Sequence, residues 1–203
     1  MDLKKILPFF SYVYHPIFIS LYGTIFYFLV SQMYVYTTAF YMILLQVGIL
    51  TLLLPLSLYY LFFSIGLVKS FTEASLKERK IPIMIQAVLL FILIRFSSSF
   101  DNLPELYYFF LGGFLSSLLA FIAIILKFKA SLHMIAVCSL ATFIYATSLH
   151  LQLPLNNSVA FMIVSIGFVA SSRLYMKSHT PIELIIGSCI GILSQVIFWH
   201  FWL

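Results

Sequence analysis

The stretch SSRLYMKSHTPIE, residues 171–183, is polar and basic, and it separates two segments that are apolar enough to lie in lipid. It places Arg173, His179 and Glu183 in one short junction, at spacings of six and four residues. An arginine binds an anion through a planar fork, a histidine can act as a nucleophile, and a carboxylate can orient that histidine. We therefore expect this junction to carry the chemistry of the protein at a membrane surface.

Composition decides the class of protein. Of the 203 residues, 63% are hydrophobic and 8% are charged, and the mean hydropathy is +1.11. No water-soluble fold could cover its surface with so few charges, so we expect an all-α, multi-pass integral membrane protein, in the inner membrane if the chain is bacterial. Cys138 and Cys189 lie in apolar runs without pair spacing, so no disulfide framework, metal or other cofactor is predicted.

About seven apolar segments are predicted to span the membrane, after a short interfacial segment that ends near His15. The second segment is long, and we expect Pro55 to kink it and Gln46 to bond to a neighbouring helix or to its own backbone. Pro82 is expected in the first turn of the third. No internal repeat or linker is found, so residues 1–203 form one predicted domain, and six spans are an alternative. The predicted spans are 17–32, 38–68, 82–96, 105–126, 133–149, 158–169 and 181–199.

Seven spans would bring three polar junctions, 69–81, 127–131 and 171–180, to the amino-terminal side of the membrane. Every basic residue except Arg95 then lies on that side. Lys and Arg are enriched in cytoplasmic loops, so this side is predicted to be cytoplasmic. Three tight spans within residues 6–68 would reverse the assignment.

Ser172, Arg173 and His179 match in type and spacing the third signature of the type 2 phosphatidic acid phosphatase (PAP2) superfamily: Ser-Arg, five residues, His, three residues, Asp. Glu183 stands where the family has Asp. The chain therefore resembles this superfamily, over about residues 75–190. The resemblance implies a PAP2-like core of transmembrane helices and a metal-independent phosphatase acting through a phosphohistidine intermediate. It also implies a site on the outer membrane face, against the charge distribution.

The other two family signatures are matched in part. ASLH, residues 130–133, stands for Pro-Ser-Gly-His, with a leucine where glycine would let the backbone approach a phosphate closely. Ser131 could instead be a simple N-cap. KERKIP, residues 77–82, resembles the signature Lys, six residues, Arg-Pro, with Arg79 and a displaced Lys77 as counterparts. Taken alone, this segment is also typical of a basic membrane flank.

The resemblance assigns roles to these residues. His179 is the expected nucleophile, Glu183 holds its ring, and His133 passes a proton to the leaving group. The residues expected to bind phosphate are Arg173, Ser131, Arg79, Lys77 and Ser172. Two other interpretations stay open: Thr180 and Glu183 also form a capping box, and Arg173 with Lys177 could anchor lipid headgroups. We expect the His179 side chain to lie at a solvated surface, and His15, His150 and His200 to be interfacial or packing residues.

These residues predict hydrolysis of a lipid phosphate or pyrophosphate, with the substrate and the bilayer as partners and no nucleic acid. Phosphatidic acid, phosphatidylglycerol phosphate, a polyprenyl pyrophosphate or a lipid A phosphate would all suit this chemistry. The alternative is a non-catalytic relative that binds anionic lipid or a partner protein. The leucine at position 132 and the irregular first signature favour that alternative.

Overall fold

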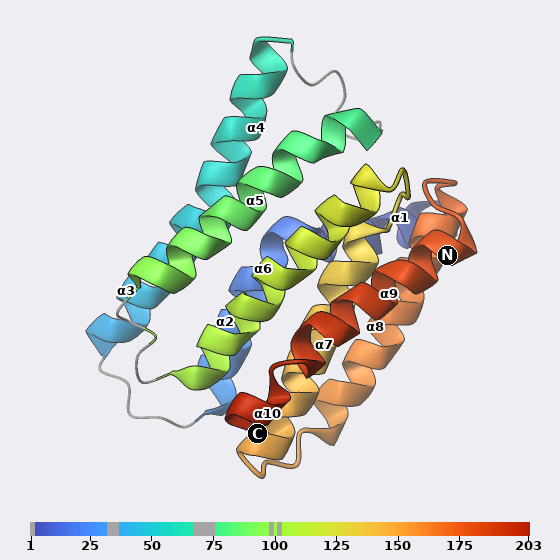
Figure 1. Ribbon diagram of the computed structural model, residues 1–203. Helices are drawn as coiled ribbons and strands as arrows, with labels where there is room; N and C mark the ends of the chain where they lie inside the picture. Colours follow the sequence, from blue (N-terminus) through green and yellow to red (C-terminus); the bar gives the residue numbers. More distant parts are fainter. Residues whose placement is uncertain (1–2, 32–36, 67–75, 98–99, 101–102) are drawn as a thin grey trace.

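The computed structural model describes residues 3–31, 37–66, 76–97, 100 and 103–203, without the side chains of residues 3–6, 37–38 and 77. Within these ranges the main elements are all helices (Figure 1). Helices α5 to α9 lie side by side and alternate in direction. The elements are α1 (Leu3–Val13), α2 (Pro16–Val30), α3 (Thr37–Gly48), the π-helix η1 (Ile49–Leu53), α4 (Leu54–Ser64), α5 (Leu76–Phe96), α6 (Pro104–Ile125), α7 (Leu132–His150), α8 (Asn156–Tyr175), α9 (Pro181–Val196) and α10 (Trp199–Trp202).

Five of the described helical stretches are long and apolar enough to cross a membrane: Ala39–Ser64, Pro104–Ile125, Leu132–His150, Asn156–Tyr175 and Pro181–Trp202. A sixth is added if α1 and α2 count as one span, bent by 66°. These helices make the chain a multi-pass membrane protein. Helix α5 is not among them because four charges lie at its start and Arg95 near its end. A membrane-spanning α5, and with it the count of seven, stays a prediction.

Two predicted boundaries are wrong. Helix α8 does not end near residue 169 but continues to Tyr175, so Ser172 and Arg173 lie in its last turn. Helix α5 begins at Leu76, so Pro82 lies inside it and does not start it. The Leu, Lys, Glu and Arg residues before Pro82 are strong helix formers, and the proline removes only one backbone hydrogen bond there. Arg79 is thus held on a helix and not in a loop.

The second predicted span, which contains Gln46 and Pro55, agrees in part with its prediction. The π-helix η1 directly precedes Pro55, yet Ala39–Ser64 still forms one span. A π-turn therefore accommodates the missing N–H of the proline within one span, and the kink expected at Pro55 stays a prediction. The polar bond expected of Gln46 is confirmed, because its Oε1 accepts a hydrogen bond of 2.9 Å from the Ser97 hydroxyl, just beyond α5.

Helix α7 is the centre of the bundle, packed against α2, α6, α8 and α9. In its most apolar stretch, 67% of the residues are buried inside the bundle, whereas only 17% are buried in the corresponding stretch of Ala39–Ser64. Helix α9 crosses α7 at close range through Gly187 and Gly191. A Cβ atom on Gly187 would lie 2.7 Å from the Ser131 carbonyl oxygen, and one on Gly191 would clash with the Ile135 carbonyl. This small-xxx-small pattern, typical of close helix pairs in membranes, was missed in the sequence.

A buried carboxylate, that of Glu105, joins α6 to α2 and α7 at the end of the bundle where α7 ends. Glu105, at the start of α6, is 5% exposed. It accepts a hydrogen bond of 3.0 Å from the Tyr27 hydroxyl and lies 3.2 Å from Nε2 of His150. His150 also packs on the Trp202 ring, which agrees with the packing role predicted for it.

Candidate functional site

Four parts of the chain meet at one end of the bundle: the bend between α1 and α2, the start of α5, and the α6–α7 and α8–α9 turns (Figure 1). Hydrogen bonds join the two turns. Lys129 Nζ donates to the Ser178 carbonyl at 3.0 Å, and the Ser131 amide donates to the Glu183 carbonyl at 3.2 Å. The fold therefore gathers the described parts of the three polar junctions around one place.

Both turns begin with the same backbone motif. Lys127 and Lys177 have positive φ angles of 61° and 53°. The next residues, Phe128 and Ser178, donate their amides to the carbonyl five residues earlier, at 2.8 and 3.1 Å. This is the Schellman motif, which reverses the chain and satisfies the last carbonyls of the helix. Helices α6 and α8 consequently end sharply, and both turns are compact.

His179 and Glu183 form the pair that the sequence predicted. Nδ1 of His179 lies 2.8 Å from Oε2 of Glu183. The same oxygen accepts the Thr180 amide at 3.2 Å, while the Thr180 hydroxyl accepts the Glu183 amide at 3.4 Å. The capping box is therefore present together with the histidine contact. With Nδ1–H donating to the carboxylate, Nε2 keeps its lone pair for an electrophile.

His179 is buried, contrary to the expectation that it lies at a solvated surface. Its side chain is 1% exposed, against 19% for that of Glu183. The hydrogen bonds from Lys129 and Ser131 hold the α8–α9 turn against the α6–α7 turn, which encloses the ring.

Burial and nearby cations keep His179 neutral. Burial lowers the pKa of His179 to about 4, and the positive charges of Arg79, Arg173 and Lys129 act in the same direction. The hydrogen bond with Glu183 opposes them. A pKa far below neutrality leaves the imidazole unprotonated at pH 7, the form that a nucleophile requires.

Two buried polar atoms at this site have no hydrogen-bond partner within the described residues. They are Nε of Arg173 and Oγ of Ser131. Arg173 is 7% exposed and Ser131 is fully buried. Ser131 occupies the N-cap position of α7, but its side chain makes no capping hydrogen bond. Buried polar groups are almost always paired, so both atoms indicate a ligand that accepts hydrogen bonds.

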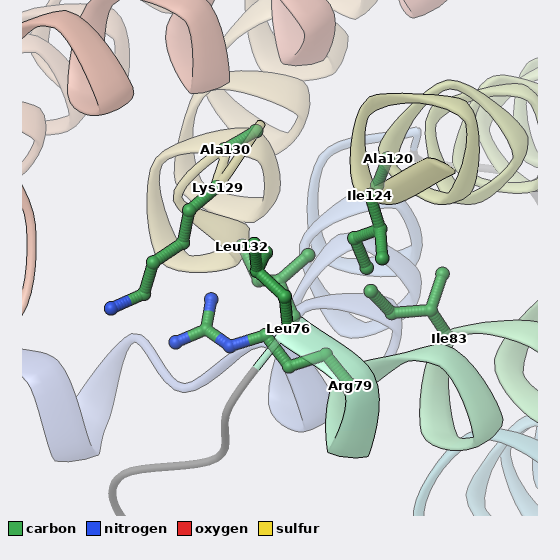
Figure 2. Close-up of a pocket in the computed structure, with 8 residues that line it drawn as sticks. All are labelled: Leu76, Arg79, Ile83, Ala120, Ile124, Lys129, Ala130 and Leu132. Carbon is green, nitrogen blue, oxygen red and sulfur yellow. The ribbon is translucent and has the colours of Figure 1, made fainter. Parts of the chain in front are cut away.

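Arg79 and Lys129 lie on a narrow crevice beside these residues. Figure 2 shows their charged ends on the same side, with Ile83, Ala120 and Ile124 on the other side. Leu132, which replaces the glycine of the family signature, lines the crevice between them. The crevice therefore has a cationic end and an apolar wall. The side chain of Lys77 lies outside the described residues.

His133 lies in the same cluster. Its ring makes an edge contact with that of His15, at 5.2 Å between centroids. The positive charge of Arg173 also acts on it, and the Ser11 backbone lies near its ring. The fold thus brings His133 to the place where a proton donor would be needed.

Ser172 makes a contact that the sequence does not predict. Its side chain is fully buried, and its Oγ lies 2.6 Å from Oγ of Ser11. This contact joins α8 to α1, and the phosphate-binding role of Ser172 stays a prediction.

Two residues were missed as members of the site. Lys129 belongs to the basic junction 127–131, but nothing in the sequence distinguishes it from Lys127. His15 was predicted to be an interfacial or packing residue because no other polar residue of interest is near it in sequence. Its contact with His133 depends on the bend between α1 and α2, which brings together residues far apart in the chain.

No protein-family model, curated protein or solved structure matches this chain. Among the described residues, no group of three or more His, Cys, Asp or Glu side chains could hold a metal ion.

Acid should destabilise the protein through His179. The unfolded histidine binds a proton near pH 6.5, whereas the folded one has a pKa of about 4. As the pH falls through this window only the unfolded state gains a proton, so the free energy of unfolding should fall by about 3 kcal/mol. Melting temperatures in detergent from pH 7 to 4 should therefore fall more steeply for the parent protein than for His179→Asn. Parallel curves would contradict the low pKa, and exposed His200→Asn is the control.

Glu183→Gln should separate the capping role of this residue from its charge. Glutamine can accept the hydrogen bonds of both His179 and Thr180, so the melting temperature should stay the same. It cannot stabilise a positive imidazole, and a charged hydrogen bond is worth about 1.5–3 kcal/mol, so phosphate release should fall about 10–100-fold. Thr180→Val is the opposite control, expected to lower stability and not the rate per folded molecule. The catalytic role is refuted if Glu183→Gln lowers stability alone.

Proposed function

We propose that the protein is a metal-independent membrane phosphatase, similar to the PAP2 superfamily, that hydrolyses a lipid phosphate or pyrophosphate. The observation that carries the proposal is a pair of atoms without a hydrogen-bond partner in the described part of the chain, Arg173 Nε and Ser131 Oγ, buried beside a neutral histidine that a carboxylate orients. Arginine and serine donors with nearby cations suit a phosphate dianion.

The chemistry proceeds in two steps. Nε2 of His179 attacks phosphorus and forms an N–P bond while the bond to the lipid oxygen breaks, and His133, which enters this step protonated, gives that oxygen its proton and becomes neutral. Water then attacks the phosphohistidine, His133 takes a proton from it, and inorganic phosphate leaves with His179 neutral again. Glu183 stabilises the positive imidazole between the steps. Arg173, Arg79 and Lys129 offset the charge on the transferred phosphoryl group.

The position of the site supports a lipid substrate. The candidate residues lie at the ends of membrane-spanning helices, where a headgroup meets water and its tail stays in hydrocarbon. The crevice of Figure 2 carries the same combination, with Arg79 and Lys129 at one end and aliphatic side chains along its wall, although it has no room for a water molecule in this structure.

Phosphate release from a panel of lipids tests the proposal. Protein purified in detergent is incubated with lipid phosphates and pyrophosphates in EDTA, with glycerol phosphate as a tail-free substrate. We expect release from at least one lipid, unchanged by EDTA and lost in His179→Asn. No release from any lipid, or release that persists in His179→Asn, would refute the proposal.

Leu132 favours a second candidate function, binding of an anionic lipid without turnover. Its side chain lines the crevice where the family has a glycine. This alternative would be supported by a lipid phosphate that binds the purified protein and is not hydrolysed. The same lipid should no longer bind the Arg173→Met variant.

A further inference from the structure

A groove on the flank of the bundle lies below the site and is not used by the chemistry above. It has a volume of about 520 Å³, which falls within the range of small-molecule sites, roughly 300–1,000 Å³. Its walls come from four helices: Val13 of α1 with Tyr14 just after it, Tyr22 and Phe26 of α2, Leu140 and Ile144 of α7, and Phe161 and Met162 of α8.

The walls of this groove are mainly apolar, and the hydroxyls of its two tyrosines already have hydrogen-bond partners. The two tyrosine hydroxyls are bonded elsewhere, that of Tyr14 to Ser165 at 2.8 Å and that of Tyr22 to the Val13 carbonyl at 3.0 Å. Phe161 on the rim is 64% exposed. Helices α7 and α8 are candidate spans, and α1 with α2 counts as one bent span, so we infer that the open side of the groove faces hydrocarbon.

Residue spacing along α2 and α7 places the groove on the same helix faces as the site. On α7, Leu140 and Ile144 follow His133 by seven and eleven residues, spacings that keep side chains on one helix face. On α2, Tyr22 and Phe26 follow His15 by the same seven and eleven residues.

Helix α8 repeats the arrangement in the opposite direction, with Met162 eleven residues before Arg173. Each wall of the groove therefore leads to a residue of the site. At the helical rise, Tyr22 and Leu140 lie roughly 10 Å below these site residues, and Asn157, sixteen residues before Arg173, lies roughly 24 Å below.

We propose that this groove binds a hydrocarbon tail of the lipid whose phosphate occupies the site. The proposal rests on the proposed function, which it deepens by naming a long-tailed substrate. Asn157 and Ser158 lie at the far end of the groove and limit the length of tail that it can hold.

Photolabelling tests the groove without requiring turnover. The full chain, purified in detergent, is irradiated with a sixteen-carbon monoalkyl phosphate that carries a diazirine near the end of its tail. Ser158→Trp should fill the far end of the groove, and Ala160→Trp, exposed on the same helix and not lining the groove, is the matched control. We expect label on the peptide with Phe161 and Met162, and about tenfold less in Ser158→Trp only.

The chain-length preference gives a second readout. For phosphate release, Ser158→Trp should raise KM about tenfold for the sixteen-carbon substrate and leave the eight-carbon one unchanged. The proposed tail site would be overturned if the label were spread over other helices or were unaffected by Ser158→Trp. Equal labelling by the corresponding alcohol would also overturn it. Groove labelling without phosphate release from any lipid would refute the phosphatase and leave the tail site standing, so the two failures are distinguishable.

Discussion

On the proposed mechanism, replacing His179 by asparagine should lower phosphate release by at least about 10³-fold, because an amide cannot accept the phosphoryl group as the imidazole does. Asparagine can still donate a hydrogen bond toward Glu183, which keeps the α8–α9 turn in place. Alanine is the poorer choice, since the ring is 1% exposed and its loss would leave a buried carboxylate contact unmade. Release rates per folded molecule, with folding checked by thermal melting, measure the effect.

The covalent intermediate gives this prediction a sharper form. Protein quenched during turnover of a radiolabelled lipid phosphate should carry acid-labile phosphate, and His179→Asn should carry none. His200→Asn, exposed at the opposite end of the bundle, should behave like the parent protein. Activity within a few-fold of the parent in folded His179→Asn would remove this residue as nucleophile.

Gly191→Ala should strongly destabilise the bundle. A Cβ atom there would clash with the Ile135 carbonyl and lie 3.1 Å from Cβ of Cys138, so α9 must move away from α7. Overpacking of this kind costs about 1–3 kcal/mol or more, and here the obstacle is backbone that cannot rotate aside. Activity should fall as well, because α7 and α9 carry Ser131 and Glu183 at their starts.

Gly167→Ala is the matched control for this prediction. Gly167 lies within α8, and a Cβ atom there would meet nothing within 4 Å. Alanine is favoured over glycine in a helix by about 1 kcal/mol, so this variant should melt at the same temperature or higher. Equal melting temperatures for the two variants would contradict the close crossing of α7 and α9.

The membrane class and most of the helices follow from the sequence alone. Hydrophobic runs of sufficient length and the charges between them are local properties, and a helix in lipid satisfies its backbone internally. The same holds for the pair His179 and Glu183, because a spacing of four residues and a capping box bring them together without help from the rest of the fold. The predicted ends of α5 and α8 were less accurate, since charged residues such as Arg79 and Arg173 also form helix.

Only the tertiary structure decided the environment of these residues. The burial of His179, the unpartnered Ser131 hydroxyl and the contact of His15 with His133 all depend on helices packed from distant parts of the chain. Ser172 illustrates the point, because its spacing matches a phosphate ligand but its hydroxyl bonds Ser11, 161 residues away. The sequence determined which side chains the helices carry, and close packing determined which of them face one another, because such contacts depend on helix crossings that no local pattern encodes.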